Sequence, residues 1–593
     1  MANGQERPAY ASPTGHMPSA IRHTPFVAAL LPVLAALAIY LPALSNGFVW
    51  DDPLVLQQLR AIRSAGDLVV LPPAIPRYYF RPLIFVSYLF DRAIGGETPY
   101  WFHASVVGWH ALNTLLVFLL GRRLFPSDWL AVSGGALLFA AYPAHVESVA
   151  WMAGRSDVIV CTFVLLTILL AMRREQQWSA WAAGGAALLA LLSKELAVVV
   201  LLLVPLLDLM STGRLHWPRY VPLVIATVIY FILRATALGT VISGMPTGAA
   251  PLQVAIDVLC AIGFYITRAL VPVGLCAYIP EVPNSLAYLF VGASIPVVAV
   301  GLSVWAWRNG RWQPSFLALW FFVTLAPSLT VIVRRSASAV VADRYLYVPS
   351  VASCLLLAWA VMRLATQRRL AARWPALAIA LLSMVWAAMA VSYTRAWTDN
   401  LAFWSDVTAK GTSDALPYRE LGTALVDRGR LNDAERALQQ AVAARGAPEG
   451  RAMTYNNLGN LYRRQGRYDD ALQAFQAGLK IGAHPIVYHN LGMTLMSKVE
   501  QEQHTSDQAA VQRDLTQARD AFQEALRIGT APNAPPAFRQ EWNAAKTRAL
   551  LGQVLFFMGD SAGARAQLDA ALQLEPTGPV ADLTRQFLKQ MGH

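Results

Sequence analysis

The sequence predicts an all-α protein in two parts: a polytopic membrane bundle of about eleven transmembrane helices, then a solenoid of helical repeats. Apolar residues make up 56% of the 593 residues and charged residues only 14%, and apolar runs of roughly spanning length recur as far as Trp404. After Trp404 the sequence changes abruptly to a charged, Ala-rich region with an internal repeat. We therefore expect a disordered cytoplasmic tail over residues 1–24, a membrane domain over 25–404 and a repeat domain over 405–593.

Eleven segments have the length and composition of transmembrane helices. They are residues 25–44, 103–121, 129–144, 157–172, 178–193, 196–211, 220–236, 286–307, 315–332, 350–367 and 375–393. The first is too long for the apolar region of a signal peptide, so we predict an uncleaved first helix. In residues 254–272, Asp257, Arg268 and interspersed glycines make a lipid-facing crossing costly, so we predict an outer-surface or re-entrant helix there.

The distribution of arginine predicts the topology of the membrane domain. The short loops after the even-numbered spans contain Arg122, Arg123, Arg173, Arg174, Arg214, Arg219, Arg308, Arg311, Arg363, Arg368, Arg369 and Arg373. Loops rich in Lys and Arg remain in the cytoplasm, so we place the amino terminus inside and, after an odd number of spans, the repeats outside. The net charge of +12 comes from scattered basic pairs without the motifs of nucleic-acid binders, so we predict no nucleic-acid partner.

A Leu-Gly pair marks each unit of the repeat domain. The pairs end at Gly422, Gly459, Gly492 and Gly552, and the segment from Asn457 to Phe475 resembles the helix–turn–helix consensus of tetratricopeptide repeats. Small residues let paired helices approach, and large ones fill the space between them. We expect about four units to stack into a curved solenoid whose concave face binds extended peptide segments.

The chain is organised around two adjacent carboxylates, Asp51 and Asp52, which follow the first predicted span and therefore lie just outside the membrane. Aromatic residues flank them. Acids in this position suit proton transfer or metal binding. A simple turn is the alternative, because Asn46-Gly47 precedes the pair and Pro53 follows it.

Further ionisable and aromatic side chains fall on the same predicted outer side. They are Arg81, His145, Glu147, Arg155, Lys194, Arg344, Tyr345 and Tyr347. Taken singly, each has a structural explanation: an interfacial aromatic anchor, an ion pair in a tight hairpin or a buried histidine. Together they suit a reaction in which a base activates a hydroxyl group while cations hold a phosphate leaving group, since the planar guanidinium of Arg matches phosphate oxygens.

The ordered set of motifs resembles the transmembrane and tetratricopeptide-repeat-containing O-mannosyltransferases, which are multi-pass GT-C glycosyltransferases. The motifs are Phe48-Val49-Trp50-Asp51-Asp52, Tyr79-Phe80-Arg81-Pro82-Leu83, His103 through Leu112-Asn113, Tyr142 through Trp151, Ser193-Lys194-Glu195 and Asp343 through Ser350. The resemblance covers essentially the whole chain. A short amino-terminal tail and few repeats, compared with the animal members, suggest a bacterial relative in the inner membrane, with the active site and the repeats facing the periplasm.

The resemblance implies transfer of a sugar, mannose or another hexose, from a polyprenyl-phosphate donor to Ser or Thr hydroxyls of a protein. It also implies that the acid of the first outer loop is catalytic, which here means Asp51 or Asp52. We hypothesise that one of them takes the proton from the acceptor, that the other orients it or holds a divalent metal, and that the anomeric carbon inverts. The remaining roles follow: His145 and Glu147 assist at the acceptor or the leaving group, and the lipid phosphate is bound by Arg81, Arg155, Lys194, Arg344, Tyr345 and Tyr347.

Two other readings remain open. The chain could be a GT-C enzyme that acts on lipid-linked or envelope glycans, with the repeats recruiting partners. It could instead be a non-catalytic membrane anchor that displays a peptide-binding scaffold. The second reading predicts that the outer-face acids are dispensable and that the concave face of residues 417–575 is not.

Overall fold

The structure is a computed structural model that describes residues 24–72, 75, 79–239, 250–334, 339–502, 508–535, 538 and 542–592. The predicted tail therefore lies outside the described residues, apart from Thr24. The chain divides into two compact units, Met1–Ala402 and Phe403–His593. Both are helical, with two isolated β-bridges, Ile279 to Val341 and Asp414 to Arg445, among the described residues. The predicted all-α class is confirmed.

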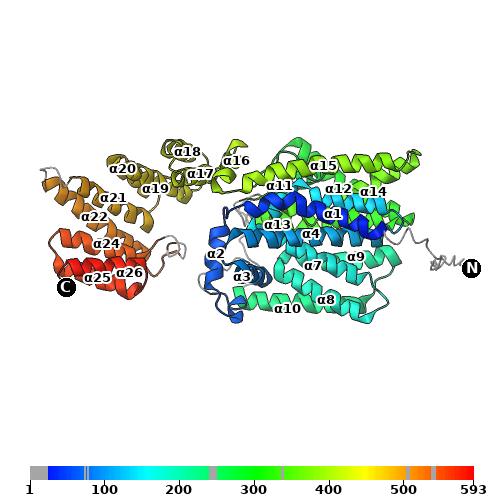
Figure 1. The fold of residues 1–593 in the computed structure, drawn as a ribbon, viewed down its shortest axis with the longest axis horizontal. Coiled ribbons are helices and arrows are strands. Elements are labelled where there is room, and N and C mark those ends of the chain that lie inside the picture. The colour runs from blue at the N-terminus through cyan, green and yellow to red at the C-terminus, as the bar shows by residue number, and fades with distance from the viewer. Residues whose placement is uncertain are drawn as a thin grey trace, which may run out of the picture. The chain divides into compact units, whose positions relative to one another are not determined.

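The helices of unit 1 run roughly along one another, and α2 and α3 lie at one end of this bundle (Figure 1). Their bounds are α1 (Thr24–Tyr40), α2 (Asp52–Ala61), α3 (Pro82–Gly95), α4 (Pro99–Leu124), α5 (Trp129–Ala141), α6 (Val146–Val149), α7 (Arg155–Ala171), α8 (Gln177–Ser193), α9 (Val200–Thr212), α10 (Val221–Leu238), α11 (Pro251–Leu270), α12 (Leu286–Arg308), α13 (Trp312–Arg334), α14 (Ser350–Gln367) and α15 (Arg373–Thr394). Helix α16 (Asn400–Ala409) continues from unit 1 into unit 2.

Within the described part of the chain, ten helices are long and apolar enough to cross a membrane, and the bent pair α5–α6 would make eleven. The pair bends by 44°, where Pro143 begins a short 3-10 helix, Pro143–His145. Helix α8, which we predict as a span, has only 17 residues. It is short against the roughly 20 residues that a crossing needs.

Helix α11, for which we predict an outer-surface or re-entrant helix, is one continuous helix of 20 residues that is long and apolar enough to cross a membrane. Its glycine serves close packing: a Cβ on Gly263 would collide with the backbone of Tyr288 in α12. The charged residues of α11 are also satisfied. Asp257 accepts a hydrogen bond from Gln253, 2.7 Å away, and Arg268 pairs with Asp343 at 3.2 Å.

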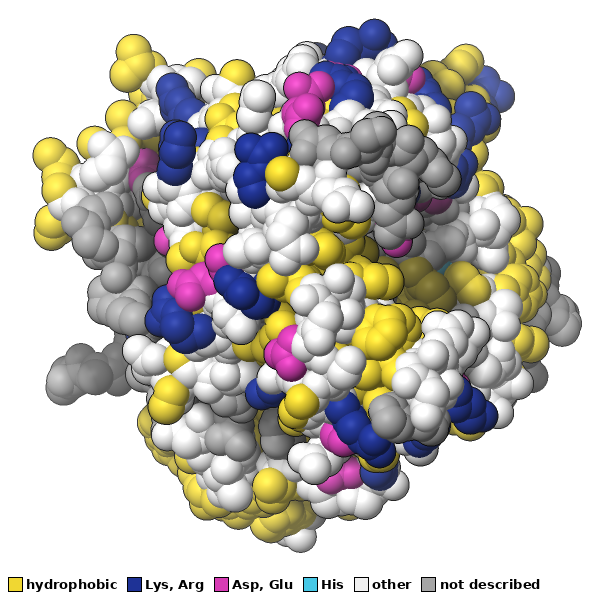
Figure 2. Space-filling model, turned by 90° about the vertical axis from the view of Figure 1, so that its left-hand side faces the viewer, with side chains coloured by type: hydrophobic (Ala, Val, Ile, Leu, Met, Phe, Trp, Pro, Cys, Tyr) yellow, Lys and Arg dark blue, Asp and Glu magenta, His cyan; other side chains and the backbone are white. Residues whose placement is uncertain are grey.

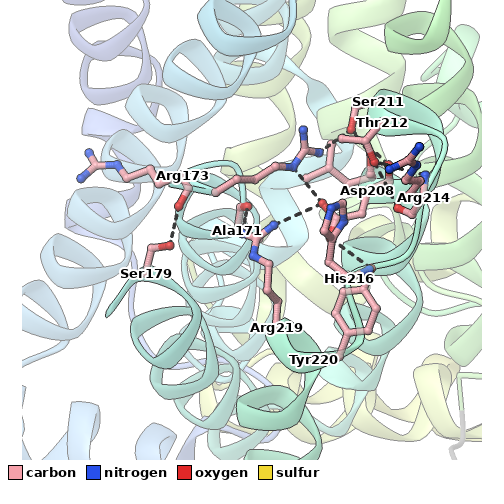
Figure 3. Close-up of polar contacts among 12 residues, drawn as sticks. Ala171, Arg173, Ser179, Asp208, Ser211, Thr212, Arg214, His216, Arg219 and Tyr220 are labelled. Atoms are coloured by element: carbon pink, nitrogen blue, oxygen red, sulfur yellow. Dashed lines mark hydrogen bonds and ion pairs between the residues drawn. The ribbon is translucent and has the colours of Figure 1, made fainter. Parts of the chain in front are cut away.

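One polar cluster gathers the Arg-rich loops that follow α7 and α9 (Figure 3). Asp208, on α9, is buried and accepts hydrogen bonds from Arg174 Nε at 3.0 Å and from the Tyr220 hydroxyl at 3.0 Å. Arg219 lies 3.4 Å from the same carboxylate and donates to the carbonyl oxygen of Ala171, the last residue of α7. We call this end of the bundle the arginine end. The end where α2 and α7 begin is the acid end.

Replacing Asp208 by alanine is expected to destabilise unit 1 by about 3 kcal/mol. That is the lower part of the range for breaking a buried ion pair, because Arg174 and Arg219 still reach water. The matched control is Glu175→Ala, which removes an exposed acid from the neighbouring loop and should change stability by less than about 0.5 kcal/mol. Thermal unfolding midpoints in detergent compare the two variants, and equal midpoints would contradict the anchoring role.

After α16, the described residues of unit 2 form four helix pairs and a final helix. They are α17 (Ala415–Asp427) with α18 (Leu431–Ala443), α19 (Pro448–Arg464) with α20 (Tyr468–Ile481), α21 (Pro485–Glu502) with α22 (Gln508–Gly529), α24 (Ala544–Phe557) with α25 (Ser561–Leu574), and α26 (Pro579–Gln590). The glycine of each Leu-Gly pair faces a large side chain of its partner helix. A Cβ there would lie 2.6 to 2.8 Å from Leu438, Phe475, Phe522 and Leu568, respectively. The predicted packing of small against large residues is therefore present in all four pairs.

The surface of unit 2 carries charges of both signs in close pairs. Examples are Arg430 with Asp433 at 2.6 Å and Arg467 with Asp470 at 2.7 Å. Figure 2 likewise shows basic and acidic side chains interspersed with apolar ones over the face that it draws.

Candidate active site

The two acids lie in a turn that joins the first apolar segment to α2. Trp50 has a positive φ of 54°, and α2 begins at Asp52 with Pro53 in its first turn, where a missing N–H costs nothing. Asp52 is fully buried: its Oδ2 accepts a hydrogen bond from the Val49 N–H and its Oδ1 from the Ala153 N–H, both at 3.0 Å. Asp52 therefore fastens the turn to the start of the α7 region.

Asp51 occupies a different environment although it is the adjacent residue. Its side chain is exposed. Partial withdrawal from water raises the pKa of Asp51, and the guanidinium of Arg344 opposes this effect. Of the two acids, Asp51 is thus the one that solvent or a substrate can reach.

The stability of the protein should fall as the pH rises from about 4 to about 7. Burial raises the pKa of Asp52 from 3.8 to about 7, against the lowering effect of its two backbone hydrogen bonds. The folded state therefore binds more protons than the unfolded state in this window, and each pH unit costs up to about 1.4 kcal/mol. Unfolding midpoints measured from pH 4 to 8 give the pH dependence of stability. In Asp52→Asn this dependence should be weaker by the contribution of about one proton. An unchanged dependence would contradict the raised pKa of Asp52.

Three cation–carboxylate pairs lie at the acid end. Glu147, fully buried on α6, accepts hydrogen bonds from the guanidinium of Arg344 and, at 3.0 Å, from its backbone N–H. Lys194 Nζ lies 2.6 Å from Asp157 Oδ1. Arg81 donates from Nε and Nη2 to the two oxygens of Glu195, at 3.0 and 2.7 Å. Burial lowers the pKa of Lys194, and Asp157 opposes this shift.

Aromatic rings connect the Arg344 and Lys194 pairs to the acid turn. The Trp50 ring stacks on Trp151 with centroids 5.1 Å apart, and the guanidinium of Arg344 lies 5.5 Å from the Trp151 ring centroid. Tyr345 then lies between two cations, 5.1 Å from Arg344 and 5.6 Å from Lys194. The structure therefore brings Asp51, Asp52, Glu147, Arg344, Tyr345 and Lys194 into one contiguous cluster.

The local sequence explains why these side chains meet. Arg81 immediately precedes Pro82, which starts α3, and Lys194 follows the last residue of α8. Gly154 lets the chain after α6 fold back closely, since a Cβ there would lie 2.5 Å from the Glu147 carbonyl oxygen. These site residues thus lie next to helix ends, Arg81 directly before α3 and Lys194 directly after α8.

Three predicted site residues lie behind the cluster and are fully buried. Arg155 pairs with Asp91 at 2.5 Å and donates to the carbonyl oxygen of Phe102. His145 Nε2 lies 2.7 Å from the Ser350 hydroxyl, and the Tyr347 hydroxyl lies 2.7 Å from His110 Nδ1. The His145 and Tyr347 rings also pack together, with centroids 4.3 Å apart.

The acid pair does not have the geometry of a metal site. Both oxygens of Asp52 accept backbone N–H groups. No group of three or more His, Cys, Asp or Glu side chains converges within the part of the chain that the structure describes. A divalent metal held by Asp51 and Asp52 does not fit these residues.

Sequence reasoning did not assign Asp157, Glu195 or Trp151 to the site. The first two are the counter-ions of Lys194 and Arg81, and Trp151 joins the acid turn to Arg344. Trp151 and Glu195 lie inside motifs that the sequence singles out, and Asp157 lies two residues after the predicted site residue Arg155. The sequence could not predict their pairing, because it joins segments that are far apart in the chain.

Family models and curated proteins match parts of the chain. Tetratricopeptide-repeat models match residues 413–482 and 545–570. Protein O-mannosyl-transferase Tmtc1 of Drosophila melanogaster is 37% identical over 150 residues, 23% of this chain and 17% of that protein. Human TMTC2 is 32% identical over 159 residues, 24% of this chain and 18% of that protein. The matched region thus spans less than a fifth of the length of these relatives.

Solved structures give weaker likenesses. The crystal structure of ArnT from Cupriavidus metallidurans, bound to undecaprenyl phosphate, aligns over 81% of this chain and 79% of that chain, with 16% identity and a TM-score of 0.39. The tetratricopeptide-repeat protein YrrB aligns over 31% of this chain and 97% of that chain, with 20% identity and a TM-score of 0.17. Over about a quarter of its length the chain is a homologue of the protein O-mannosyl-transferases of the TMTC group, as its motifs predict, and it carries tetratricopeptide repeats.

Proposed function

We propose that the chain is an inverting GT-C glycosyltransferase that moves a hexose, mannose in the first instance, from a polyprenyl-phosphate donor to a Ser or Thr hydroxyl of a protein. The observation that carries this proposal is the exposed carboxylate of Asp51 within the electrostatic reach of Arg344, at the end of the bundle that also holds the Lys194 and Arg81 ion pairs. A base and a set of phosphate-binding cations are the two parts that this reaction needs. The homology to protein O-mannosyl-transferases supports the same reaction class.

In the proposed reaction Asp51 accepts the proton of the acceptor hydroxyl. The acceptor oxygen forms a bond to the anomeric carbon while the bond from that carbon to the phosphate oxygen breaks, so the configuration inverts. The bonding electrons leave with the polyprenyl phosphate. Arg344, Lys194 and Arg81 stabilise its charge, since Arg and Lys that already bind one carboxylate keep further N–H donors.

We assign roles to the other predicted site residues from their contacts. Asp52 and Glu147 orient Asp51 and Arg344, because each is fully buried and occupied by hydrogen bonds. Tyr345 lies between the two cations and contributes to the phosphate site. Arg155, His145 and Tyr347 support the cluster from behind.

We propose that the acid end faces the periplasm of a bacterial inner membrane. Helix α4 has Phe102 beside Arg155 at the acid end and ends with Arg122 and Arg123. Helix α12 ends with Arg308, next to Trp307, which donates to Met210 near the Asp208 cluster. The Arg-rich loops thus gather at the arginine end, and such loops are retained in the cytoplasm.

The repeats would present the acceptor. The Trp397 ring packs 5.9 Å from Trp151, so the chain leaves unit 1 at the acid end. A solenoid that holds an extended protein segment on this side would raise the effective concentration of its hydroxyls, as linked binding modules do.

The test uses the purified full chain, a synthetic Ser/Thr-containing acceptor and lipid donors that carry either one hexose or an oligosaccharide. Mass spectrometry of the acceptor should show a single added hexose, and only with the monosaccharide donor. Transfer of the oligosaccharide alone would favour an enzyme of envelope glycans, and no transfer to any acceptor would favour the scaffold. Deleting residues 410–593 should lower transfer to proteins more than transfer to short peptides.

A further inference from the structure

The segment that ends unit 1 holds the acid turn at two backbone positions. Asn400 Oδ1 accepts a hydrogen bond from the Trp50 N–H at 2.8 Å. The carbonyl oxygen of Thr398 accepts one from the Gly47 N–H, also at 2.8 Å. These contacts join residues about 350 positions apart in the chain, so local sequence does not impose them.

Trp50, which donates this hydrogen bond to Asn400, has a strained backbone. Trp50 has a φ of 54°, in the left-handed region that bulky residues rarely adopt. Such a conformation persists only where surrounding contacts fix it, and it is found mainly at functional sites. Here the contacts include the Asn400 side chain on the backbone and the rings of Trp151 and Tyr278 on the side chain.

The same residue begins the helix that leads to the repeats. Asn400 is the first residue of α16, which continues across the boundary into unit 2. The neighbouring Asp399 caps this helix, because its Oδ1 accepts a hydrogen bond from the Ala402 N–H at 2.8 Å. Asp399 therefore secures α16, whereas the Asn400 side chain secures Trp50.

We propose that Asn400 is a positioning residue for sugar transfer: it fixes Trp50 in the left-handed conformation and thereby sets the direction of the Asp51 carboxylate, tying the acid to the helix that enters the repeats. The proposal rests on the proposed function of Asp51.

Three variants of the full chain test the proposal. Asn400→Ala removes the acceptor oxygen, Asn400→Asp keeps it, and Asp399→Ala removes the hydrogen bond from the Ala402 N–H at the start of α16 while keeping Asn400. We expect Asn400→Ala to lower kcat for transfer about 10- to 100-fold at an unchanged KM for the donor, since a displacement of about 1 Å can cost that much. The kcat values of Asn400→Asp and Asp399→Ala should stay within about threefold of the parent value, because both variants keep the acceptor oxygen that holds Trp50.

Hydrogen exchange provides a readout that does not depend on activity. The amide exchange of residues 47–53 should accelerate in Asn400→Ala and remain near the parent rate in the other two variants. The proposal is overturned if Asn400→Ala changes neither exchange nor kcat, or if Asp399→Ala lowers kcat as much as Asn400→Ala does. An inactive parent protein would instead refute the proposed function, and the exchange rates would still decide whether Asn400 holds the turn.

Discussion

Replacing Asp51 by asparagine is expected to lower the rate of sugar transfer about 10²- to 10⁴-fold, the range that a general base contributes. The substitution keeps the shape of the side chain and removes only its ability to take a proton. Because Asp51 is exposed, the free energy of unfolding should change by less than about 0.5 kcal/mol. Initial rates of hexose transfer and unfolding midpoints, measured on the same preparation, check both parts.

The pH profile separates the base from a merely structural acid. Surrounding protein raises the pKa of Asp51 above its ordinary value, so transfer by the parent protein should fall as the pH is lowered through that pKa and the carboxylate takes up a proton. The residual activity of Asp51→Asn should lack this fall. Asp128→Asn, which alters an exposed acid at the other end of the bundle, is the control and should keep both rate and profile.

Replacing Arg344 by methionine should have the largest combined effect on stability and activity. It leaves the fully buried carboxylate of Glu147 without its cation, and removing one partner of a buried pair costs about 3–5 kcal/mol. It also removes one of the proposed phosphate ligands. We therefore expect a large drop in the unfolding midpoint together with loss of transfer.

A double variant distinguishes the two consequences. In Arg344→Met/Glu147→Gln the buried charge is gone, and the amide oxygen introduced by Glu147→Gln can still accept the backbone N–H of residue 344. The midpoint should therefore recover by at least half of its loss, whereas transfer should stay absent. Arg60→Met, at the exposed pair with Glu97, is the control and should cost less than about 1 kcal/mol. Recovery of transfer in the double variant would rule out Arg344 as a phosphate ligand.

The residue types at the site could be predicted from the sequence, but their partners could not. Adjacent acids next to a turn signal, and cations at the ends of apolar runs, are local features. That Asp52 turns inward while Asp51 faces solvent depends on the N–H of Ala153, about a hundred residues further along the chain. Likewise, nothing near Trp50 indicates its positive φ, because groups that hold it, among them Asn400 and Trp151, come from distant parts of the chain.

The fold shows the same division between local and distant causes. Apolar length predicted the membrane helices, and the Leu-Gly period predicted the repeat pairs. The prediction for α11 weighed its glycine and its charges as if they faced lipid, whereas Gly263 packs against α12 and Arg268 pairs with Asp343. Asp208 went unnoticed within an apolar run, and only the structure shows the two arginines that it binds.

The central claim is that the acid turn and the repeats work in one compartment, and labelling of single cysteines tests it most directly. In a background without the native cysteines, Ser64→Cys reports the loop after the acid turn, Glu449→Cys the repeats and Arg368→Cys the loop between α14 and α15, all at exposed positions. The outer membrane of the cells is made permeable, the inner membrane is left intact, and a membrane-impermeant maleimide is added. It should label the cysteines at positions 64 and 449, and it should label the cysteine at position 368 only after the inner membrane is opened. Labelling of Ser64→Cys and Glu449→Cys from opposite sides would contradict the account.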